Sequence, residues 1–178
     1  MEKQIQSIVL GGGCFWCTEA IFQRIPGVIK ITPGYAGGST ANPNYDSVSE
    51  GLSGHAEVIE IFFDGHKVTL DYLLEVFFAA HDPTTLNKQG DDVGSQYRST
   101  ILYADDSQKR IAEKSLKKAQ ANFKEKISTQ ISRLEKFHPA ENYHKNYFEN
   151  NPSQPYCKSV ILPKIQKVER KFGLNPRG

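Results

Sequence analysis

A cysteine at the point where an apolar segment meets a helical pattern is the clearest chemical group in this sequence. Cys14 follows three glycines at residues 11–13 and precedes Phe15 and Trp16, the latter being the chain's single tryptophan. A thiol in the first turn of a helix faces unpaired backbone N–H groups and the positive end of the helix dipole, which favour the thiolate. Glycines leave room for a substrate, and the aromatic rings offer an apolar surface. We therefore expect Cys14 to be a nucleophile that acts on a small apolar group.

The other two cysteines leave alternatives open. Cys17 lies three residues after Cys14, which is the C-x-x-C spacing that thiol–disulfide oxidoreductases use at the start of a helix. A buried structural cysteine at position 14 is another alternative, since free cysteine is often buried. A zinc site would need a second pair of ligands at short spacing. Cys157 and the five scattered histidines do not provide one, so we expect no bound metal.

A glutamate in an apolar strand is the second candidate. Residues 55–63 alternate as a strand does, and Glu57 falls on the same side as Ile59, Ile61 and Phe63. Burial disfavours the charged carboxylate, raises its pKa and leaves a proton to donate near neutral pH. The alternative is an exposed glutamate at a sheet edge, and the residues alone do not decide between the two.

Two long polar segments contribute three more candidates. Tyr45 lies in residues 33–54, and Asp92 and Tyr97 lie in or just after residues 83–96. On sequence alone, an aspartate beside glycines is more often a turn former, and a tyrosine in a long loop is more often a packing aromatic. We expect the first segment to form an ordered loop over the site, because it is too long and too aromatic for a simple connector.

The elements that position these residues follow one another without a regular strand–helix repeat, and the order lacks a dinucleotide-type crossover. We therefore predict an α+β fold, a two-layer sandwich in which helices pack on a mixed sheet with a ferredoxin-like core and long wrapping loops. The predicted strands cover residues 5–10, 28–31, 55–63, 97–103 and 127–134, and the predicted helices cover residues 14–25, 69–80, 107–126, 141–149 and 163–172.

Composition limits the function classes. The 178 residues include 22 Lys and Arg against 20 Asp and Glu, for a net charge of +2. This charge provides no strong field for nucleic acid or an acidic membrane. Residues 1–10 lack the apolar stretch of a secretion signal, and nothing later approaches a membrane span. We expect a cytoplasmic protein, and the odd number of cysteines in a reducing compartment favours catalytic thiols over a disulfide framework.

Seven short motifs occur in one order over nearly the whole chain. They are Gly-Cys-Phe-Trp at 13–16, Gly-Tyr-Ala-Gly-Gly at 34–38, Asn-Pro-Asn-Tyr at 42–45, Gly-His-Ala-Glu at 54–57, His-Asp-Pro-Thr at 81–84, Gly-Ser-Gln-Tyr-Arg-Ser at 94–99 and Ala-Glu-Asn-Tyr-His at 140–144. Together they resemble the motifs of the peptide methionine sulfoxide reductase A family. This resemblance is far more specific than the C-x-x-C pair alone.

The resemblance implies a role for each candidate. The thiolate of Cys14 would attack the sulfur of a methionine S-sulfoxide, free or in proteins, while Glu57 acts as the acid that protonates its oxygen. The other matched residues hydrogen-bond the oxygen and hold the acid, or form the pocket for the substrate's ε-methyl group: Tyr45, Asp92 and Tyr97 in the first set, Phe15 and Trp16 in the second.

The same resemblance implies a second thiol and an external electron donor. Cys14 would be left as a sulfenic acid, which Cys157, in the C-terminal extension 151–178, would resolve by forming a disulfide. Cys17 is the alternative, although an i,i+3 disulfide would require the helix to distort. Thioredoxin would then reduce the disulfide, so no bound cofactor is expected. Because residues 163–178 contain no cysteine, no further relay step is expected.

The implied protein is an enzyme for the repair of oxidised proteins, and we expect a monomer with a single catalytic domain at residues 1–178. Two other classes stay open on the residues alone. One is a dithiol carrier or disulfide isomerase that works through Cys14 and Cys17. The other is a methionine-binding module without catalysis.

Overall fold

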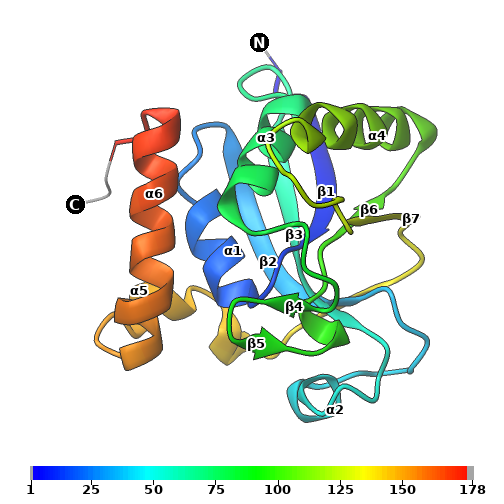
Figure 1. Cartoon of the computed structure of the whole chain (residues 1–178), viewed down its shortest axis with the longest axis vertical. Helices are drawn as coiled ribbons and strands as arrows, with labels where there is room; N and C mark the ends of the chain where they lie inside the picture. The colour runs from blue at the N-terminus through cyan, green and yellow to red at the C-terminus, as the bar shows by residue number, and fades with distance from the viewer. Residues whose placement is uncertain (1, 176–178) are drawn as a thin grey trace.

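A six-stranded mixed sheet forms the centre of the computed structural model, which describes residues 2–175 (Figure 1). Its ferredoxin-like part consists of β1 (Ile5–Gly11), α1 (Phe15–Phe22), β2 (Val28–Ala36), β3 (Ala56–Asp64), α3 (Leu70–Ala80) and β6 (Thr100–Tyr103). These strands lie in the order β6-β1-β3-β2, and each is antiparallel to its neighbours. Since α1 and α3 connect them in the βαββαβ order, the predicted α+β fold with a ferredoxin-like core is confirmed.

Two short strands extend the sheet at its edges. β7 (Gln130–Arg133) pairs in parallel with β6, and β8 (Phe137–Pro139) pairs antiparallel with β2. A separate two-stranded ribbon is formed by β4 (Lys88–Gln89) and β5 (Asp92–Val93). The sequence pattern predicts neither β8 nor the ribbon, because strands of two or three residues are too short to show an alternation.

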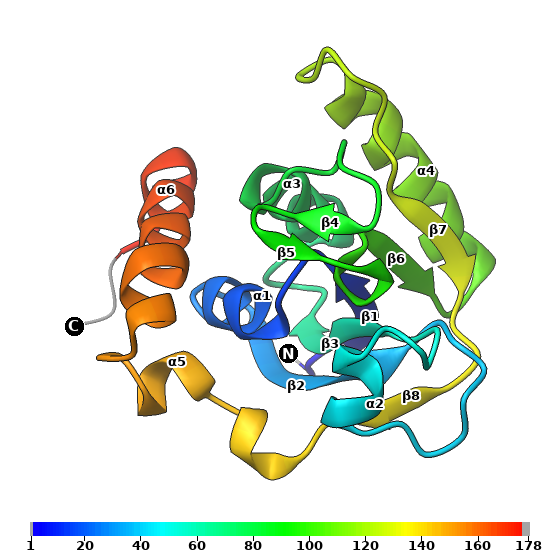
Figure 2. The ribbon, with the colours of Figure 1, turned by 60° about the horizontal axis from the view of Figure 1, so that its bottom comes forward.

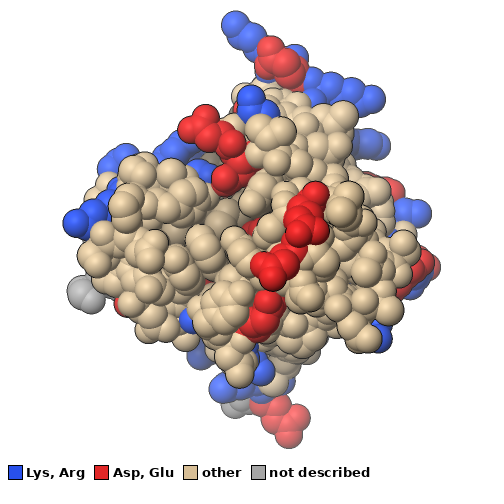
Figure 3. All heavy atoms as spheres, turned by 90° about the horizontal axis from the view of Figure 1, so that it is seen from below, with Lys and Arg blue, Asp and Glu red and all other residues tan. Residues whose placement is uncertain are grey.

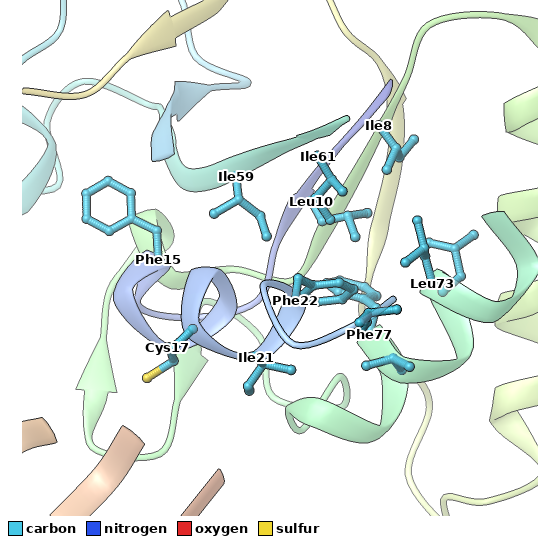
Figure 4. Close-up of a cluster of buried hydrophobic side chains, with 14 of the residues drawn as sticks. Ile8, Leu10, Phe15, Cys17, Ile21, Phe22, Ile59, Ile61, Leu73 and Phe77 are labelled. Carbon is cyan, nitrogen blue, oxygen red and sulfur yellow. The ribbon is translucent and has the colours of Figure 1, made fainter. Parts of the chain in front are cut away.

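The main core lies between the helices and the sheet. Ile59 of β3 belongs to one buried cluster with Phe22 of α1 and Phe77 of α3 (Figure 4). Val58 points to the opposite face of the sheet, where it belongs to a second, smaller cluster. The predicted alternation of this strand is therefore confirmed, and it places Glu57 on the side of the main core.

Two predicted helices are shorter than their sequence patterns suggest, and the first is α1, which ends at Phe22 and not at residue 25. α4 (Asp106–Gln120) ends well before the end of the predicted range 107–126. The Gln120 side chain explains this end, because its amide donates to the carbonyl of Glu125 and its oxygen accepts the N–H of Ile127. A side chain that satisfies backbone groups in this way stabilises a turn in place of further helix.

Residues 33–54 are more regular than predicted. β2 continues to Ala36, and α2 (Tyr45–Ser49) forms within the segment. Asn44 caps this helix, since its side chain accepts the N–H of Ser47 while the Ser47 hydroxyl accepts the N–H of Asn44. This reciprocal capping box fixes the direction of the helix. The segment is thus an ordered cover, as expected, but it includes a strand end and a short helix.

The predicted helix at residues 141–149 is wrong. The segment contains a 3-10 turn, η2 (Asn142–His144), and a single helical turn, α5 (Tyr147–Asn150). Asn146 separates them with a φ of 54°, in the left-handed region that interrupts a helix. This interruption directs Tyr147 toward α1, where its ring stacks on an aromatic side chain.

The C-terminal helix lies beside α1 (Figures 1 and 2). α6 (Leu162–Phe172) follows directly on a π-helical turn, η3 (Cys157–Ile161), so the helix predicted at 163–172 is confirmed. Residues 176–178 of the predicted extension lie outside the described residues. In the described part of the chain, no helix is long and apolar enough to cross a membrane.

Candidate active site

Glycines shape the turn that carries Cys14. Gly13 has a φ of +93°, and a Cβ atom at this position would lie 2.7 Å from Cγ of Gln89. A Cβ atom at Gly11 would lie 3.0 Å from the carbonyl oxygen of Glu57. The glycines therefore allow β1, β3 and the β4–β5 ribbon to approach one another at the point where Cys14 begins α1.

Cys14 is the N-cap residue of α1. Its φ of −60° and ψ of 127° are extended, and its carbonyl oxygen accepts the N–H of Cys17 at 3.1 Å. The side chain thus lies at the start of the helix, as predicted, but the residue is only 8% exposed. Little of this residue is therefore accessible to solvent.

Burial outweighs the helix terminus in setting the pKa of Cys14. Burial raises the pKa of this thiol well above its usual value, and the hydrogen bond to Cys17 and the charge of Glu57 raise it further. The same hydrogen bond lowers the pKa of Cys17. The backbone N–H of Trp16 at the helix start does favour the thiolate of Cys14, as predicted, but burial outweighs it and the thiol form prevails. Cys17 is the more acidic thiol of the pair.

Glu57 is buried beside Cys14. It is 2% exposed, and its Oε1 accepts the backbone N–H of Phe15 at 3.1 Å. Burial raises the pKa of Glu57 to about 8, the nearby charge of Asp92 adds to the increase, and the N–H of Phe15 opposes it. Of the two alternatives for this residue, the structure shows the buried carboxyl and not the exposed edge.

Asp92, Tyr45 and Tyr97 surround this carboxyl. Burial and the charge of Glu57 raise the pKa of both tyrosine hydroxyls, so both lie near its side chain. Asp92 begins β5, and its carboxylate accepts a hydrogen bond from the hydroxyl of Tyr156 at 2.9 Å. The structure thus brings together the three residues that sequence reasoning alone interpreted as a turn former and packing aromatics.

Phe15 and Trp16 differ in exposure and contacts. Phe15 is 1% exposed and packs against the ring of Tyr35. Trp16 is half-buried and stacks on Tyr147, with ring centroids 3.7 Å apart and planes 7° from parallel. Its indole N–H donates to Nδ1 of His144 at 3.0 Å. Phe15 therefore lies at the bottom of the site, and Trp16 lies at its side.

Residues 141–157 supply most of the groups that sequence reasoning missed, and we call this segment the C-terminal wall. His144 is fully buried and packs against Phe15, and burial lowers its pKa, which keeps the ring neutral. Tyr147 and Tyr156 both face Trp16. The available signals were the Ala-Glu-Asn-Tyr-His motif and the density of tyrosines that follows it.

Glu141 ties this wall to the rest of the site. Its carboxylate accepts the Tyr35 hydroxyl at 2.9 Å and the backbone N–H of Tyr45 at 3.0 Å. These hydrogen bonds lower the pKa of Glu141 and keep it charged. A single carboxylate therefore joins β2, α2 and the C-terminal wall.

Cys157 lies near Cys17. It is fully buried at the start of η3, and burial and the charge of Cys17 raise the pKa of its thiol. Sγ of Cys17 lies 3.7 Å from the hydroxyl of Tyr156, the residue next to Cys157. All three cysteines are unpaired thiols. They form one group around the start of α1.

One histidine and one arginine side chain hold the segment at residues 38–54 in place. His55 accepts the N–H of Gly38 at 3.0 Å through Nδ1, so its Nε2–H donates to the carbonyl of Thr40 at 2.7 Å. Arg98 donates to the carbonyl of Gly54 at 3.1 Å. These hydrogen bonds fix residues 38–54 against the turn before β6.

His81 has a structural place. Its Nδ1 lies 2.6 Å from the carbonyl oxygen of Phe77 and its Nε2 lies 2.7 Å from the hydroxyl of Ser99. Burial lowers its pKa to about 4, so the ring is neutral at physiological pH. It joins the end of α3 to the start of β6. Within residues 2–175, no group of three or more His, Cys, Asp or Glu side chains could hold a metal ion.

The face that contains the start of α1 is largely uncharged. The first turn of α1 and the β4–β5 ribbon lie in the lower half of Figure 1, and Figure 3 shows the molecule from below. Uncharged residues cover most of this face, acidic side chains cross its middle, and most basic side chains lie at its rim. Such a surface suits an uncharged polar group better than an anion.

Comparison with known proteins gives a consistent result. The family model "Peptide methionine sulfoxide reductase" matches residues 6–175. The chain is 54% identical over 161 residues to "Peptide methionine sulfoxide reductase MsrA" of Nautilia profundicola, which covers 89% of this chain and 91% of the relative. Mxr1 from Saccharomyces cerevisiae in reduced form superimposes with a TM-score of 0.82 and 34% identity, over 86% of this chain and 89% of Mxr1.

A second structure of the yeast protein shows it with a partner. Mxr1 in complex with Trx2 superimposes with a TM-score of 0.59 and 24% identity, over 83% of this chain and 89% of that chain. This match supports the fold alone. The family model and the relatives over most of the chain establish more: the chain belongs to the peptide methionine sulfoxide reductase family, whose members are oxidoreductases that reduce methionine sulfoxide.

Proposed function

We propose that this chain reduces the S-epimer of methionine sulfoxide, free or in proteins, with Cys14 as the nucleophile and Glu57 as the acid. The observation that carries the proposal is the hydrogen bond from the backbone N–H of Phe15 to the buried Glu57 carboxyl. A carboxyl with a raised pKa thus lies directly beside the residue that follows Cys14, and this supports the two roles. A thiol and a sulfoxide are thereby converted to a sulfenic acid and a thioether, with no other atom gained or lost.

Glu57 provides the proton that the sulfoxide oxygen needs. Because its pKa is raised to about 8, the carboxyl is mostly protonated at neutral pH and does not repel a thiolate at Cys14. The hydroxyls of Tyr45 and Tyr97 remain protonated, since their pKa values are raised, and they donate hydrogen bonds to the same oxygen. Asp92 acts on Glu57 through its charge and so helps to keep the proton on the acid.

The aromatic side chains recognise the apolar end of the substrate. Phe15 forms the bottom and Trp16 one side of a pocket for the ε-methyl group, and the stacked ring of Tyr147 supports the indole. Enclosure by aromatic rings favours a methyl group through dispersion and removal from water. The same dry surroundings keep Glu57 neutral, so one environment serves both recognition and acid catalysis.

A second thiol completes the cycle. After methionine leaves, Cys157 or Cys17 forms a disulfide with the sulfur of Cys14, and the sulfenic oxygen leaves as water. A thioredoxin then reduces the disulfide and is itself reduced by NADPH through thioredoxin reductase. The likeness to yeast Mxr1, which has been solved with Trx2, supports a donor of this kind. We infer a monomeric cytoplasmic repair enzyme whose single catalytic domain spans residues 1–178 and ends in the extension 151–178.

The test is NADPH oxidation coupled through thioredoxin and thioredoxin reductase. Wild-type protein is expected to consume methionine S-sulfoxide and not the R-epimer, and Cys14→Ser is expected to abolish turnover. Turnover that survives in Cys14→Ser would overturn the proposal. Binding of the sulfoxide without release of methionine by the wild type would instead favour a binding module.

The hydrogen-bonded Cys14–Cys17 pair favours one competing function, a dithiol carrier. Reduction of insulin disulfides tests it. A carrier requires both thiols and no Glu57, so loss of insulin reduction in Cys17→Ser with full activity in Glu57→Gln would support the carrier. No insulin reduction by the wild type would exclude it.

A further inference from the structure

The geometry at the start of α1 removes the objection to a Cys14–Cys17 disulfide. Cys14 is the N-cap residue with extended backbone angles, and Cys17 lies in the first turn of the helix. The carbonyl of Cys14 accepts the N–H of Cys17 at 3.1 Å, and the two thiols hydrogen-bond each other. Because Cys14 is outside the helical segment, a bond between the sulfurs needs no distortion of the helix interior, contrary to the expectation from the i,i+3 spacing.

Cys17 also faces the C-terminal wall. Its sulfur points away from Phe15 and the buried core, toward the orange ribbon of the C-terminal segment (Figure 4). It lies 3.7 Å from the hydroxyl oxygen of Tyr156, and Cys157 is the next residue. Cys157 is fully buried in the same apolar cluster as Cys14 and Cys17. Cys17 is therefore hydrogen-bonded to Cys14 and lies close enough to Cys157 for its charge to raise the pKa of that thiol.

A chain of hydrogen bonds leads from this thiol to a carboxylate. The hydroxyl of Tyr156 donates its proton to Asp92 at 2.9 Å, so its oxygen is left to accept the S–H of Cys17. The hydrogen bond from Cys14 and the positive charge of Lys164 on α6 favour the thiolate of Cys17, whereas burial and the charge of Asp92 oppose it. The favourable effects prevail and lower the pKa of Cys17 to about 7, so this thiol loses its proton more easily than an ordinary cysteine, as an attacking thiol requires.

We propose that Cys17 is the first resolving thiol and Cys157 the second, so that the oxidising equivalents pass from Cys14 through Cys17 to Cys157. This relay rests on the proposed reduction of methionine sulfoxide at Cys14. It differs from direct resolution by Cys157, and it assigns a step to each of the three cysteines of the chain.

Each step balances. The Cys17 thiolate attacks the sulfur of the Cys14 sulfenic acid, the S–O bond breaks, and the hydroxide takes up the proton that Cys17 has lost and leaves as water. Cys157 then attacks Sγ of Cys17, the Cys14–Cys17 bond breaks, and Cys14 departs with the proton that Cys157 gives up. The two oxidising equivalents come from the sulfoxide, and the Cys17–Cys157 disulfide is the species that a thioredoxin reduces.

The test is a single turnover without reductant. Wild-type protein is mixed with one equivalent of methionine S-sulfoxide and quenched with an alkylating reagent at increasing times. Released methionine is then measured, and disulfides are mapped by mass spectrometry of peptides. The relay predicts one equivalent of methionine, an early Cys14–Cys17 disulfide and a final Cys17–Cys157 disulfide. A Cys14–Cys157 disulfide formed without a Cys14–Cys17 precursor would overturn it.

Variants separate the two steps. Cys157→Ser should release one equivalent of methionine and stop at Cys14–Cys17. Cys17→Ser should release the same amount, but its Cys14 sulfenic acid, trapped with dimedone, should persist about tenfold longer or more, since the adjacent attacking thiol is lost. Equal lifetimes of the sulfenic acid in Cys17→Ser and the wild type would contradict the relay. Cys157→Ala and Cys17→Ala repeat the test if a buried serine prevents folding.

The same experiment distinguishes failure of the relay from failure of the proposed function. If no form of the protein that contains Cys14 releases methionine, the reduction itself is absent. If methionine is released in one equivalent but the disulfides appear in another order, only the relay fails. Cys14→Ser is the matched control, and it should release no methionine and form no disulfide with the sulfoxide.

Discussion

The site is built from two regions that differ in how they are held. The proposed nucleophile, Cys14, and the proposed acid, Glu57, belong to the active-site frame, by which we mean β1, β3 and the turn at residues 11–14. This frame lies in the middle of the sheet, and backbone pairing such as Leu10 with Ile59 fixes its parts relative to one another. The C-terminal wall has no strand between η2 and η3, and side-chain contacts attach it to α1 and to the β4–β5 ribbon.

The difference indicates a division of labour. Chemistry at Cys14 requires a carboxyl at a constant distance, and a paired sheet provides this because its backbone hydrogen bonds and buried side chains resist displacement. Recognition and thiol exchange require a surface that can move aside. The wall suits these steps, since short helical turns with few backbone partners open at lower cost than central strands.

The largest expected effect comes from the acid of the frame. Glu57→Gln should lower the rate of methionine formation at pH 7 by about a hundredfold or more, the usual contribution of a positioned general acid. Glu60→Gln is the matched control, because Glu60 lies on the same strand and is half-buried. Quantification of methionine by chromatography checks both. An equal rate in Glu57→Gln and the wild type would remove the acid from the mechanism.

The pH dependence of stability sharpens the same assignment. Folding raises the pKa of Glu57 from an ordinary 4.5 to about 8, so the folded chain binds this proton more tightly than the unfolded chain does. The free energy of unfolding should therefore fall as pH rises between these values, by at most about 1.4 kcal/mol per pH unit, and level off above them. Urea unfolding of the wild type and of Glu57→Gln measures it, since the variant lacks this contribution. Parallel curves for the two proteins would show that the carboxyl is not held neutral.

A third change tests how tightly the frame is built. Gly13→Ala introduces a Cβ at a φ of +93° and 2.7 Å from Gln89, and it should lower the free energy of unfolding by about 1 to 3 kcal/mol. Gly90→Ala is the control, because Gly90 also has a positive φ of 58° but has no heavy atom within 4 Å of an added Cβ. The difference between the two losses in the free energy of unfolding measures the crowding at Gly13. Equal losses would mean that the β4–β5 ribbon moves to make room for the added Cβ.

The smallest effect is expected in the wall. Tyr156→Phe removes the hydrogen bond to Asp92 and should cost about 1 kcal/mol or less in stability, because the edge of the ring keeps its place beside Trp16. Its turnover should fall only severalfold. Steady-state kinetics and thermal unfolding together check this. A loss of turnover as large as that of Glu57→Gln would show that the C-terminal wall and the active-site frame act as one rigid unit.

The sequence predicts the frame well because its signals are local. Period-two alternation placed Glu57 with Ile59, and three glycines before Cys14 marked the turn. Its electrostatics could not be predicted in the same way. The helix start favours a thiolate at Cys14, but the neighbours that bury this thiol come from distant parts of the chain, and desolvation dominates.

The wall illustrates what local patterns miss. Its apolar and aromatic residues have helical spacing between 141 and 149, yet Asn146 adopts a left-handed conformation and the helix does not form. The reason is tertiary, since Tyr147 stacks on Trp16 and Glu141 accepts hydrogen bonds from Tyr35 and Tyr45. No pattern within the segment reports these partners. The family motifs identified the residues, and only the fold shows their contacts.

The antiparallel register between β1 and β3 also limits how the length of this chain can change. Leu10 pairs with Ile59, so the position of the Cys14 thiol relative to the Glu57 carboxyl depends on the number of residues in two neighbouring strands. One inserted or deleted residue in β3 would turn the acid to the opposite face of the sheet, and one in β1 would shift the turn that carries Cys14. Insertions between β2 and β3 do not change the number of residues in either strand. Natural variation in length should therefore occur mainly in the segment between β2 and β3 and not in the strands themselves.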